Sequence, residues 1–242
     1  MKAVLYIGHG SRNSSSNEEF HAFIQEVKPH INADIQEVGF LENASPTISE
    51  AVAACVEKGA SEILVMPVLL LAGIHGKEDI PEEIAKMKER YPYVLIRYGR
   101  ELGADPLAAK ILAERVQEKH FSEDNSKKAL LLVGHGSRIK ESESQLSELS
   151  NLLKAELNSL HVFPCFLKES SPDYQEELQN VVESGYETIY TIPHLLFTGI
   201  FTKRMKEMAE GVSADVIHCE PLGFHSKLAE LVVKRMKGEF EN

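Results

Sequence analysis

Two histidines and one glutamate follow three successive apolar segments in the first half of the chain. His9 stands in a Gly-His-Gly turn after the first segment, Glu42 follows the second and His75 follows the third. In an open parallel sheet the carboxyl ends of the strands share one edge, where ligands bind. Two imidazoles and a carboxylate suit a divalent first-row metal such as iron, cobalt, nickel or zinc. The same groups accept protons near neutral pH, so the trio predicts a site that holds a metal and takes protons.

The elements that would position these residues alternate between strand and helix along the chain. Such alternation is typical of parallel βαβ units in an open, doubly wound α/β sheet. One expected helix begins with Ser45 as its cap and Pro46 at its first position, and ends at Gly59. The other elements expected in the first half are strands at 2–7, 34–40, 61–67 and 93–98 and helices at 13–28, 77–90 and 105–119.

The chain repeats itself with a fixed offset of 126 residues. Gly-His-Gly-Ser-Arg occurs around His9 and again around His135, and the Pro-x-Leu-Leu-x-x-Gly stretch that begins at residue 67 returns at residue 193. Several landmarks in one register indicate an internal duplication. We therefore expect two similar open parallel-sheet, Rossmann-like domains. They are an N-terminal domain of residues 1–122 that carries the active site and a degenerate C-terminal repeat of residues 123–242, with a polar connection at 121–128.

The second copy keeps only its histidine, His135. At the 126 offset Lys168 stands where the first copy has its glutamate, and Phe201 stands where it has its second histidine. Each member of the trio taken alone has a structural or solvated explanation, and for His135 that explanation is preferred. A role in packing would conserve shape between the copies, whereas these exchanges alter chemistry. We therefore expect the first half to be the working half.

An apolar loop at residues 69–76 follows the third expected strand, and residues 195–201 form its counterpart. Two such loops facing across a cleft would form a slot for a large planar apolar ligand. The alternative is that they pack against each other at a domain interface. Hydroxyl and basic side chains near the same edge would pair with carboxylates of a ligand. They are Ser11, Arg12 and Lys77 in the first half and Arg138, Lys203 and Arg204 in the second.

Composition excludes several function classes. A net charge of -11 over 242 residues argues against general nucleic-acid binding, which needs a basic face. No run approaches the roughly 18 apolar residues of a membrane span, and no signal peptide is recognisable, so we expect a cytoplasmic protein without membrane contact. The three cysteines lie far apart, which favours neither disulfides nor a zinc knuckle nor an iron–sulfur cluster. P-loop, GxSxG and complete dinucleotide-binding motifs are absent from the sequence.

With the repeated GHGSR and Pro-x-Leu-Leu-x-x-Gly motifs, the chain resembles the class II chelatases of tetrapyrrole biosynthesis over its whole length. It is most similar to the sirohydrochlorin ferrochelatase and CbiX-type cobaltochelatase group. The resemblance implies ATP-independent insertion of Fe²⁺ into sirohydrochlorin, the last step to siroheme, with no cofactor beyond the substrate metal. Co²⁺ is the alternative metal. The chain ends without the histidine-rich segment and cysteine-ligated cluster of some long cobaltochelatases, which favours iron.

The resemblance also assigns roles to residues. His9, Glu42 and His75 match the family's catalytic and metal-binding positions. Insertion releases two pyrrole protons, so a neutral imidazole, by preference His9, would accept one, and activity should fall below a pH of about 6.5. Sirohydrochlorin carries eight carboxylates, which need basic partners at the edge. The expected substrate-binding residues are Ser11, Arg12, Asn43, Leu70, Leu71, Ala72, Gly73 and Ile74.

Two other classes remain open at this point. The same histidines and glutamate would serve a cytosolic divalent-metal-binding or delivery protein that never meets a tetrapyrrole. They would also serve a metal-dependent hydrolase that acts on a small anion. A flat apolar slot favours the chelatase, and a narrow polar pocket favours the hydrolase.

Overall fold

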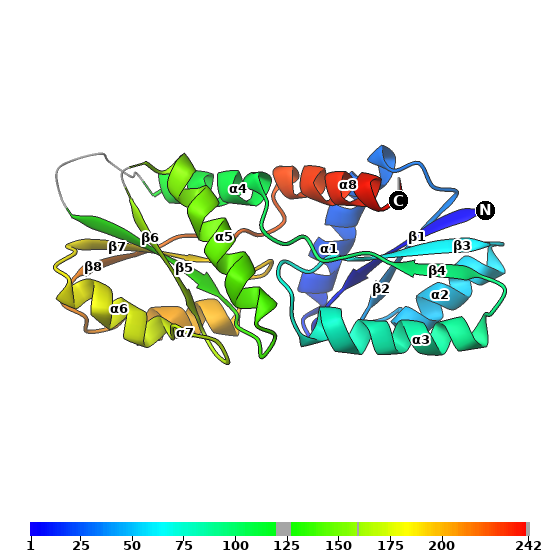
Figure 1. The fold of residues 1–242 in the computed structure, drawn as a ribbon, viewed down its shortest axis with the longest axis horizontal. Helices are drawn as coiled ribbons and strands as arrows, with labels where there is room; N and C mark the ends of the chain where they lie inside the picture. The colour runs from blue at the N-terminus through cyan, green and yellow to red at the C-terminus, as the bar shows by residue number, and fades with distance from the viewer. Residues whose placement is uncertain (120–126, 159, 241–242) are drawn as a thin grey trace. The chain divides into compact units, whose positions relative to one another are not determined.

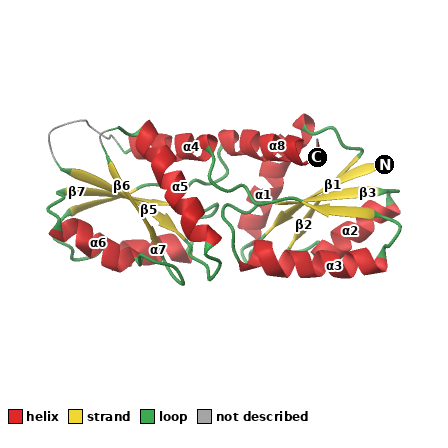
Figure 2. Ribbon diagram, viewed as in Figure 1, coloured by secondary structure: helices red, strands yellow, loops and turns green. Residues whose placement is uncertain are grey.

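Each half of the chain forms a four-stranded parallel sheet with helices around it (Figures 1 and 2). The computed structural model describes residues 1–119, 127–158 and 160–240. The strand orders, β2-β1-β3-β4 and β6-β5-β7-β8, are the same in the two halves, which confirms the expected duplication and α/β class. The strands are β1 (Lys2–Gly8), β2 (Ile35–Phe40), β3 (Glu62–Pro67) and β4 (Leu95–Tyr98), and then β5 (Lys128–Gly134), β6 (His161–Phe166), β7 (Thr188–Pro193) and β8 (Asp215–His218).

The central strands are buried on both faces. Residues 3–8 of β1 and all of β5 are buried, as expected for parallel strands covered by helices on both sides. The described helices close to the expected positions are α1 (Ser14–Val27), α2 (Ile48–Glu57), α3 (Ile80–Arg90) and α4 (Pro106–Gln117) in the first repeat, with α5 (Glu141–Glu156), α6 (Tyr174–Glu183), α7 (Ile200–Met208) and α8 (Ser226–Phe240) in the second. None of the helices in the described part of the chain is long and apolar enough to cross a membrane.

The helix after β2 begins later than the sequence suggested, and Ser45 is not its cap. Thr47 caps α2: its hydroxyl accepts a hydrogen bond from the backbone N–H of Glu50 at 3.3 Å. The Glu50 carboxylate in turn accepts one from the backbone N–H of Thr47 at 2.7 Å. This capping box satisfies two N–H groups at once, which a cap at Ser45 would not. Ser45 and Pro46, joined by a cis peptide bond, belong to the preceding turn.

The compact units differ from the sequence repeats in the helix that ends each repeat. Unit 1 comprises the described parts of 1–103 and 228–242, and unit 2 those of 104–227. In unit 1, Arg97 on β4 donates to the backbone oxygen of Glu239 on α8 at 3.4 Å. In unit 2, Arg115 on α4 donates to the backbone oxygen of Pro221 at 3.2 Å.

This grouping divides the chain differently from the expected domains 1–122 and 123–242, because α4 packs with the second repeat and α8 with the first. The boundary expected between residues 122 and 123, and most of the expected polar connection, lie outside the described residues. The position of that boundary stays a prediction.

Candidate functional site

Three strands of unit 1 end at the same level and bring the expected site residues to one edge. In the parallel register Gly8 of β1 lies beside Phe40 of β2, and Ile7 beside Pro67 of β3. His9 and Glu42 follow the ends of the first two strands, and the backbone N–H of Glu42 donates to the His9 carbonyl at 3.1 Å. The carboxyl edge of this sheet therefore positions both side chains, as the sequence predicted.

The structure brings His9, Glu42 and His75 together. The Nε2 atoms of His9 and His75 lie 3.1 Å apart, and the two rings stand perpendicular with centroids 4.6 Å apart. Oε1 of Glu42 lies 3.7 Å from Nε2 of His9. All three side chains are close to half exposed, between 41% and 51%. Their polar atoms converge on a point that is open to a ligand.

A glycine in a left-handed conformation makes this convergence sterically possible. Gly10 has φ +86°, and a Cβ on it would lie 1.8 Å from the carbonyl oxygen of Glu42. Neither the backbone angle nor the contact admits another residue without distortion. Gly10 therefore allows the turns after β1 and β2 to approach closely enough for Glu42 to reach His9.

The hydrogen bonds on the far side of each ring select the tautomers. Nδ1 of His9 lies 3.0 Å from the Gly10 carbonyl, and Nδ1 of His75 lies 2.7 Å from Oδ2 of Asp79. Both partners are acceptors, so each favours the Nδ1–H tautomer of its ring, in which the Nε2 lone pair is available to a metal ion. Two metal-bound imidazole nitrogens at about 2.0–2.1 Å in tetrahedral geometry lie about 3.3 Å apart. The observed pair is therefore spaced as two ligands of one metal ion.

The site is open rather than closed around an ion. Among the described residues, no group of three or more His, Cys, Asp or Glu side chains is arranged to hold a metal ion as it stands. Two imidazole nitrogens are in ligand positions and Glu42 lies farther out, an arrangement that leaves coordination positions free as transient or catalytic sites do. Cysteine ligation is not available here: Cys55, Cys165 and Cys219 are buried, and burial raises the pKa of each thiol.

His75 belongs to a π-turn, residues His75–Asp79, that leads directly into α3. The N–H of Ile80 donates to the His75 carbonyl five residues back. Tyr98 on β4 donates to the Gly76 carbonyl at 2.8 Å, which fixes the turn to the sheet. The sequence interpretation, which began this helix near Lys77, missed both the π-turn and Asp79. A carboxylate four residues after a histidine was the signal for their contact.

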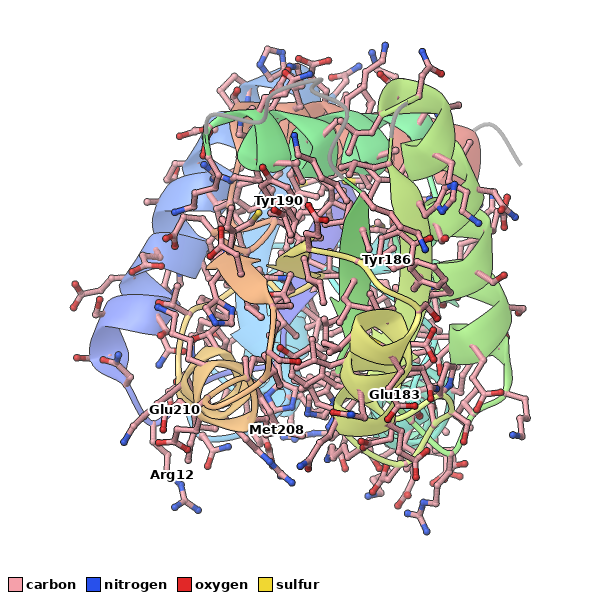
Figure 3. All side chains as sticks on the ribbon, turned by 90° about the vertical axis from the view of Figure 1, so that its left-hand side faces the viewer. Arg12, Glu183, Tyr186, Tyr190, Met208 and Glu210 are labelled. Atoms are coloured by element: carbon pink, nitrogen blue, oxygen red, sulfur yellow. The ribbon has the colours of Figure 1, made fainter. Side chains whose placement is uncertain are left out.

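Three of the expected substrate-binding residues lie in the turns beside the trio. Nε of Arg12 donates to Oδ1 of Asn43 at 3.4 Å, which joins the turn after β1 to the turn after β2. Arg12 is exposed and its guanidinium points outward (Figure 3). Ser11 is half-buried, and its N–H donates to Asn17 at 2.9 Å. Arg12 and Asn43 are therefore accessible to a ligand. The Ser11 backbone N–H is not, because it already donates to Asn17 in α1.

The five remaining candidates, residues 70–74, form the apolar loop between β3 and the π-turn. The carbonyls of Leu69 and Leu70 accept from the N–H groups of Leu102 and Gly103 at 2.9 Å, which holds the loop in place within unit 1. Ala72 is only 2% exposed and offers little surface to a ligand. The half-buried members, with apolar surface available for contact, are Leu70, Leu71, Gly73 and Ile74.

The chain is similar to known proteins over nearly its whole length. The family model CbiX matches the chain twice, over residues 3–119 and 129–239. The sirohydrochlorin ferrochelatase of Priestia megaterium is 40% identical over 98% of this chain and 90% of its own length. A sirohydrochlorin cobaltochelatase of the same organism is 32% identical over the whole chain and 81% of its own length.

The fold is shared with a solved relative. SirB from Bacillus subtilis, in a structure with Fe³⁺, superimposes with a TM-score of 0.89 at 34% identity, covering 98% of this chain and 94% of that one. The family model spans both repeats, and the curated relatives match the chain over nearly its full length. The chain therefore belongs to the CbiX family of class II tetrapyrrole chelatases.

Proposed function

We propose that the protein is a sirohydrochlorin ferrochelatase, which inserts Fe²⁺ into sirohydrochlorin to give siroheme. The observation that carries the proposal is the pair of Nε2 atoms of His9 and His75, 3.1 Å apart, with the Glu42 carboxylate beside them. The names of the ferrochelatase relatives and the iron in the SirB structure support the choice of substrate and metal.

In the proposed reaction the histidines present Fe²⁺ to one face of the macrocycle. Metal insertion exchanges one Fe²⁺ for two pyrrole protons, so no reductant, oxidant or ATP is needed. The Nε2 of His9 accepts one proton as it releases the metal, and Glu42 assists as a ligand or as the second base. Both tasks need an unprotonated imidazole, so activity should fall as the solution becomes acidic.

The macrocycle is held by the apolar loop and by polar groups in the adjacent turns. Leu70, Leu71 and Ile74 supply apolar surface for the ring, and Arg12 with Asn43 pairs with peripheral carboxylates. The slot between this loop and its counterpart in the second repeat stays a prediction. So does the cytoplasmic location.

Sirohydrochlorin cobaltochelatase activity is the second candidate. A set of two imidazoles and a carboxylate binds Co²⁺ at least as well as Fe²⁺, since affinity rises along that series. The relative from Priestia megaterium named for cobalt supports this alternative at lower identity than the relative named for iron. A metal-delivery role without a tetrapyrrole uses the same side chains and differs in requiring no macrocycle.

The assay that tests the proposal mixes the full-length protein with sirohydrochlorin under anaerobic conditions. Fe²⁺ or Co²⁺ is added, and the change in tetrapyrrole absorption is followed against the uncatalysed rate. A higher kcat/KM with Fe²⁺ supports the ferrochelatase assignment, and a higher value with Co²⁺ transfers it to the cobalt enzyme. Metal binding without any acceleration would leave the delivery role instead.

A further inference from the structure

We propose that Asp79 is a positioning residue for metal binding: it holds the His75 imidazole as the Nδ1–H tautomer, with its Nε2 lone pair aimed at the point that faces His9. The inference rests on the proposed function, because the ion in question is the metal to be inserted. Asp79 itself would not touch the metal or the macrocycle.

The contact between Asp79 and His75 is short and charge-assisted. Oδ2 of Asp79 lies 2.7 Å from Nδ1 of His75, on the side of the ring opposite to His9. A carboxylate that accepts the Nδ1 hydrogen orients a ligating histidine and makes Nε2 a better donor. Within the described residues the group in this position for His9 is the Gly10 carbonyl, at 3.0 Å, so the two rings are contacted by groups of different charge.

The basic side chain nearest in sequence is directed elsewhere. Lys77 lies in the same π-turn, but its Nζ pairs with the carboxylate of Glu101 at 3.5 Å. Glu101 is 7% exposed, so this ion pair anchors the turn to the body of unit 1. The Asp79 carboxylate pairs with the imidazole of His75.

The π-turn is the reason that Asp79 reaches the site instead of the core. At the 126 offset Asp79 corresponds to Met205, which is 2% exposed and belongs to the core of unit 2. In unit 1 the buried core position falls one residue later, at Ile80. A π-turn adds one residue to a helix, and such turns are frequent at functional sites. Because of the extra residue, the Asp79 side chain contacts His75, and the next residue, Ile80, packs in the core of unit 1.

The test measures Co²⁺ binding to the full-length protein without tetrapyrrole, by the visible absorption of the bound ion. Asp79→Ala should weaken binding by about 10- to 100-fold, the range found for orienting carboxylates of this kind. Glu78→Ala is the matched control. It removes the same charge from the exposed residue just before Asp79 in the turn, and it should leave the Co²⁺ affinity unchanged.

A double-mutant cycle separates positioning from a general effect of charge or folding. Asp79→Ala should cause no further loss of Co²⁺ affinity in a His75→Ala background, because the aspartate acts through that imidazole. An independent loss in the double variant, or wild-type affinity in Asp79→Ala, would overturn the inference.

The tautomer gives a second readout that needs no variant. The ¹⁵N NMR spectrum of the metal-free wild-type protein should show neutral His75 protonated at Nδ1, and an Nε2–H tautomer would contradict the inference. Wild-type chelatase activity is measured in parallel. Its absence would overturn the proposed function, whereas activity together with an unaffected Asp79→Ala variant would overturn only the role of Asp79.

Discussion

The edge of the sheet in unit 1 and its counterpart in unit 2 have the same geometry and different chemistry. His9 and His75 stand perpendicular with ring centroids 4.6 Å apart, and His135 and Phe201 stand perpendicular at 4.4 Å. The turn glycines are also equivalent: Gly136 has φ +93°, and a Cβ on it would lie 1.6 Å from the carbonyl of Lys168. The duplicated fold thus builds the same close approach twice, and residue identity alone decides which edge presents two imidazoles and a carboxylate.

The two edges also differ in the helix that follows the apolar loop. Unit 1 has a π-turn before α3, whereas in unit 2 Phe201 lies in the first turn of α7 with no π-turn between. Loss of the proposed metal-binding side chains and absence of the π-turn coincide in the described part of unit 2. This coincidence agrees with a π-turn that serves the site rather than the fold.

The largest effect on kcat/KM is expected from substitution of the histidines of unit 1, and the equivalent histidine of unit 2 should show almost none. His9→Ala and His75→Ala should each lower kcat/KM by at least about 100-fold, because each removes a proposed metal ligand or proton acceptor. His135→Ala changes the same side chain on the same backbone and should retain most of the activity. The anaerobic chelatase assay measures all three. Equal losses in the three variants would show that unit 2 takes part in the chemistry.

A buried histidine in unit 2 provides the second contrast. His194 is 3% exposed, and neither ring nitrogen has a hydrogen-bond partner among the described residues. Its counterpart at the 126 offset is Val68, which is fully buried in unit 1. Burial lowers the pKa of His194 to about 4, so below the pKa of about 6.5 in the unfolded chain the unfolded state binds the proton first.

His194→Val should therefore flatten the acid dependence of stability. In the wild type the free energy of unfolding falls as the pH drops from about 6.5 toward 4, and this histidine accounts for about 2 kcal/mol of that loss at pH 5. Urea unfolding at pH 7.5 and pH 5 measures the difference. His30→Val, at an exposed position, is the control. An acid dependence unchanged by His194→Val would show that the ring finds a proton acceptor when charged.

Neutralising Glu42 should lower kcat/KM more than neutralising its unit 2 counterpart, Lys168. The difference should be smaller than the one between the equivalent histidines. Glu42→Gln should lower kcat/KM about tenfold or somewhat more, because the amide is a poorer metal ligand and a far weaker base. Lys168→Gln, the same neutralisation in unit 2, should change it less than twofold. If both variants lost activity to the same extent, Lys168 would also take part in the reaction, and the contrast between the two repeats at this position would fail.

The smallest expected effect is a gain of binding in unit 2. Phe201→His with Lys168→Glu restores the donor types on an equivalent backbone, so a second Co²⁺ should bind weakly. We expect about 10- to 100-fold lower affinity than in unit 1, since Met205 supplies no orienting carboxylate. Isothermal titration in a His9→Ala background isolates this site. No binding there would show that matching ring geometry is insufficient for a metal site.

Much of the fold and of the site could be predicted because both follow from short-range signals. Apolar runs that end at Gly-His-Gly predict buried parallel strands. The fixed offset predicts that the second repeat forms the same strands and helices as the first. The N-cap of α2 was misplaced because Ser45 and Thr47 are both good cap residues, and the contact with Glu50 decided between them. Ala72 was expected to contact substrate, but a loop's polarity does not reveal which of its small residues is buried.

The sequence by itself determined the α/β class, the duplication, the trio of His9, Glu42 and His75, and the loss of two of its members in the second repeat. These follow from residue types in register along the chain. Only the tertiary structure decided that the two Nε2 atoms lie 3.1 Å apart and that the Asp79 carboxylate contacts Nδ1 of His75. It also decided that the helices ending the repeats join opposite units. Those features depend on a one-residue change of helical register and on packing between distant segments, and neither has a periodic signature in the sequence.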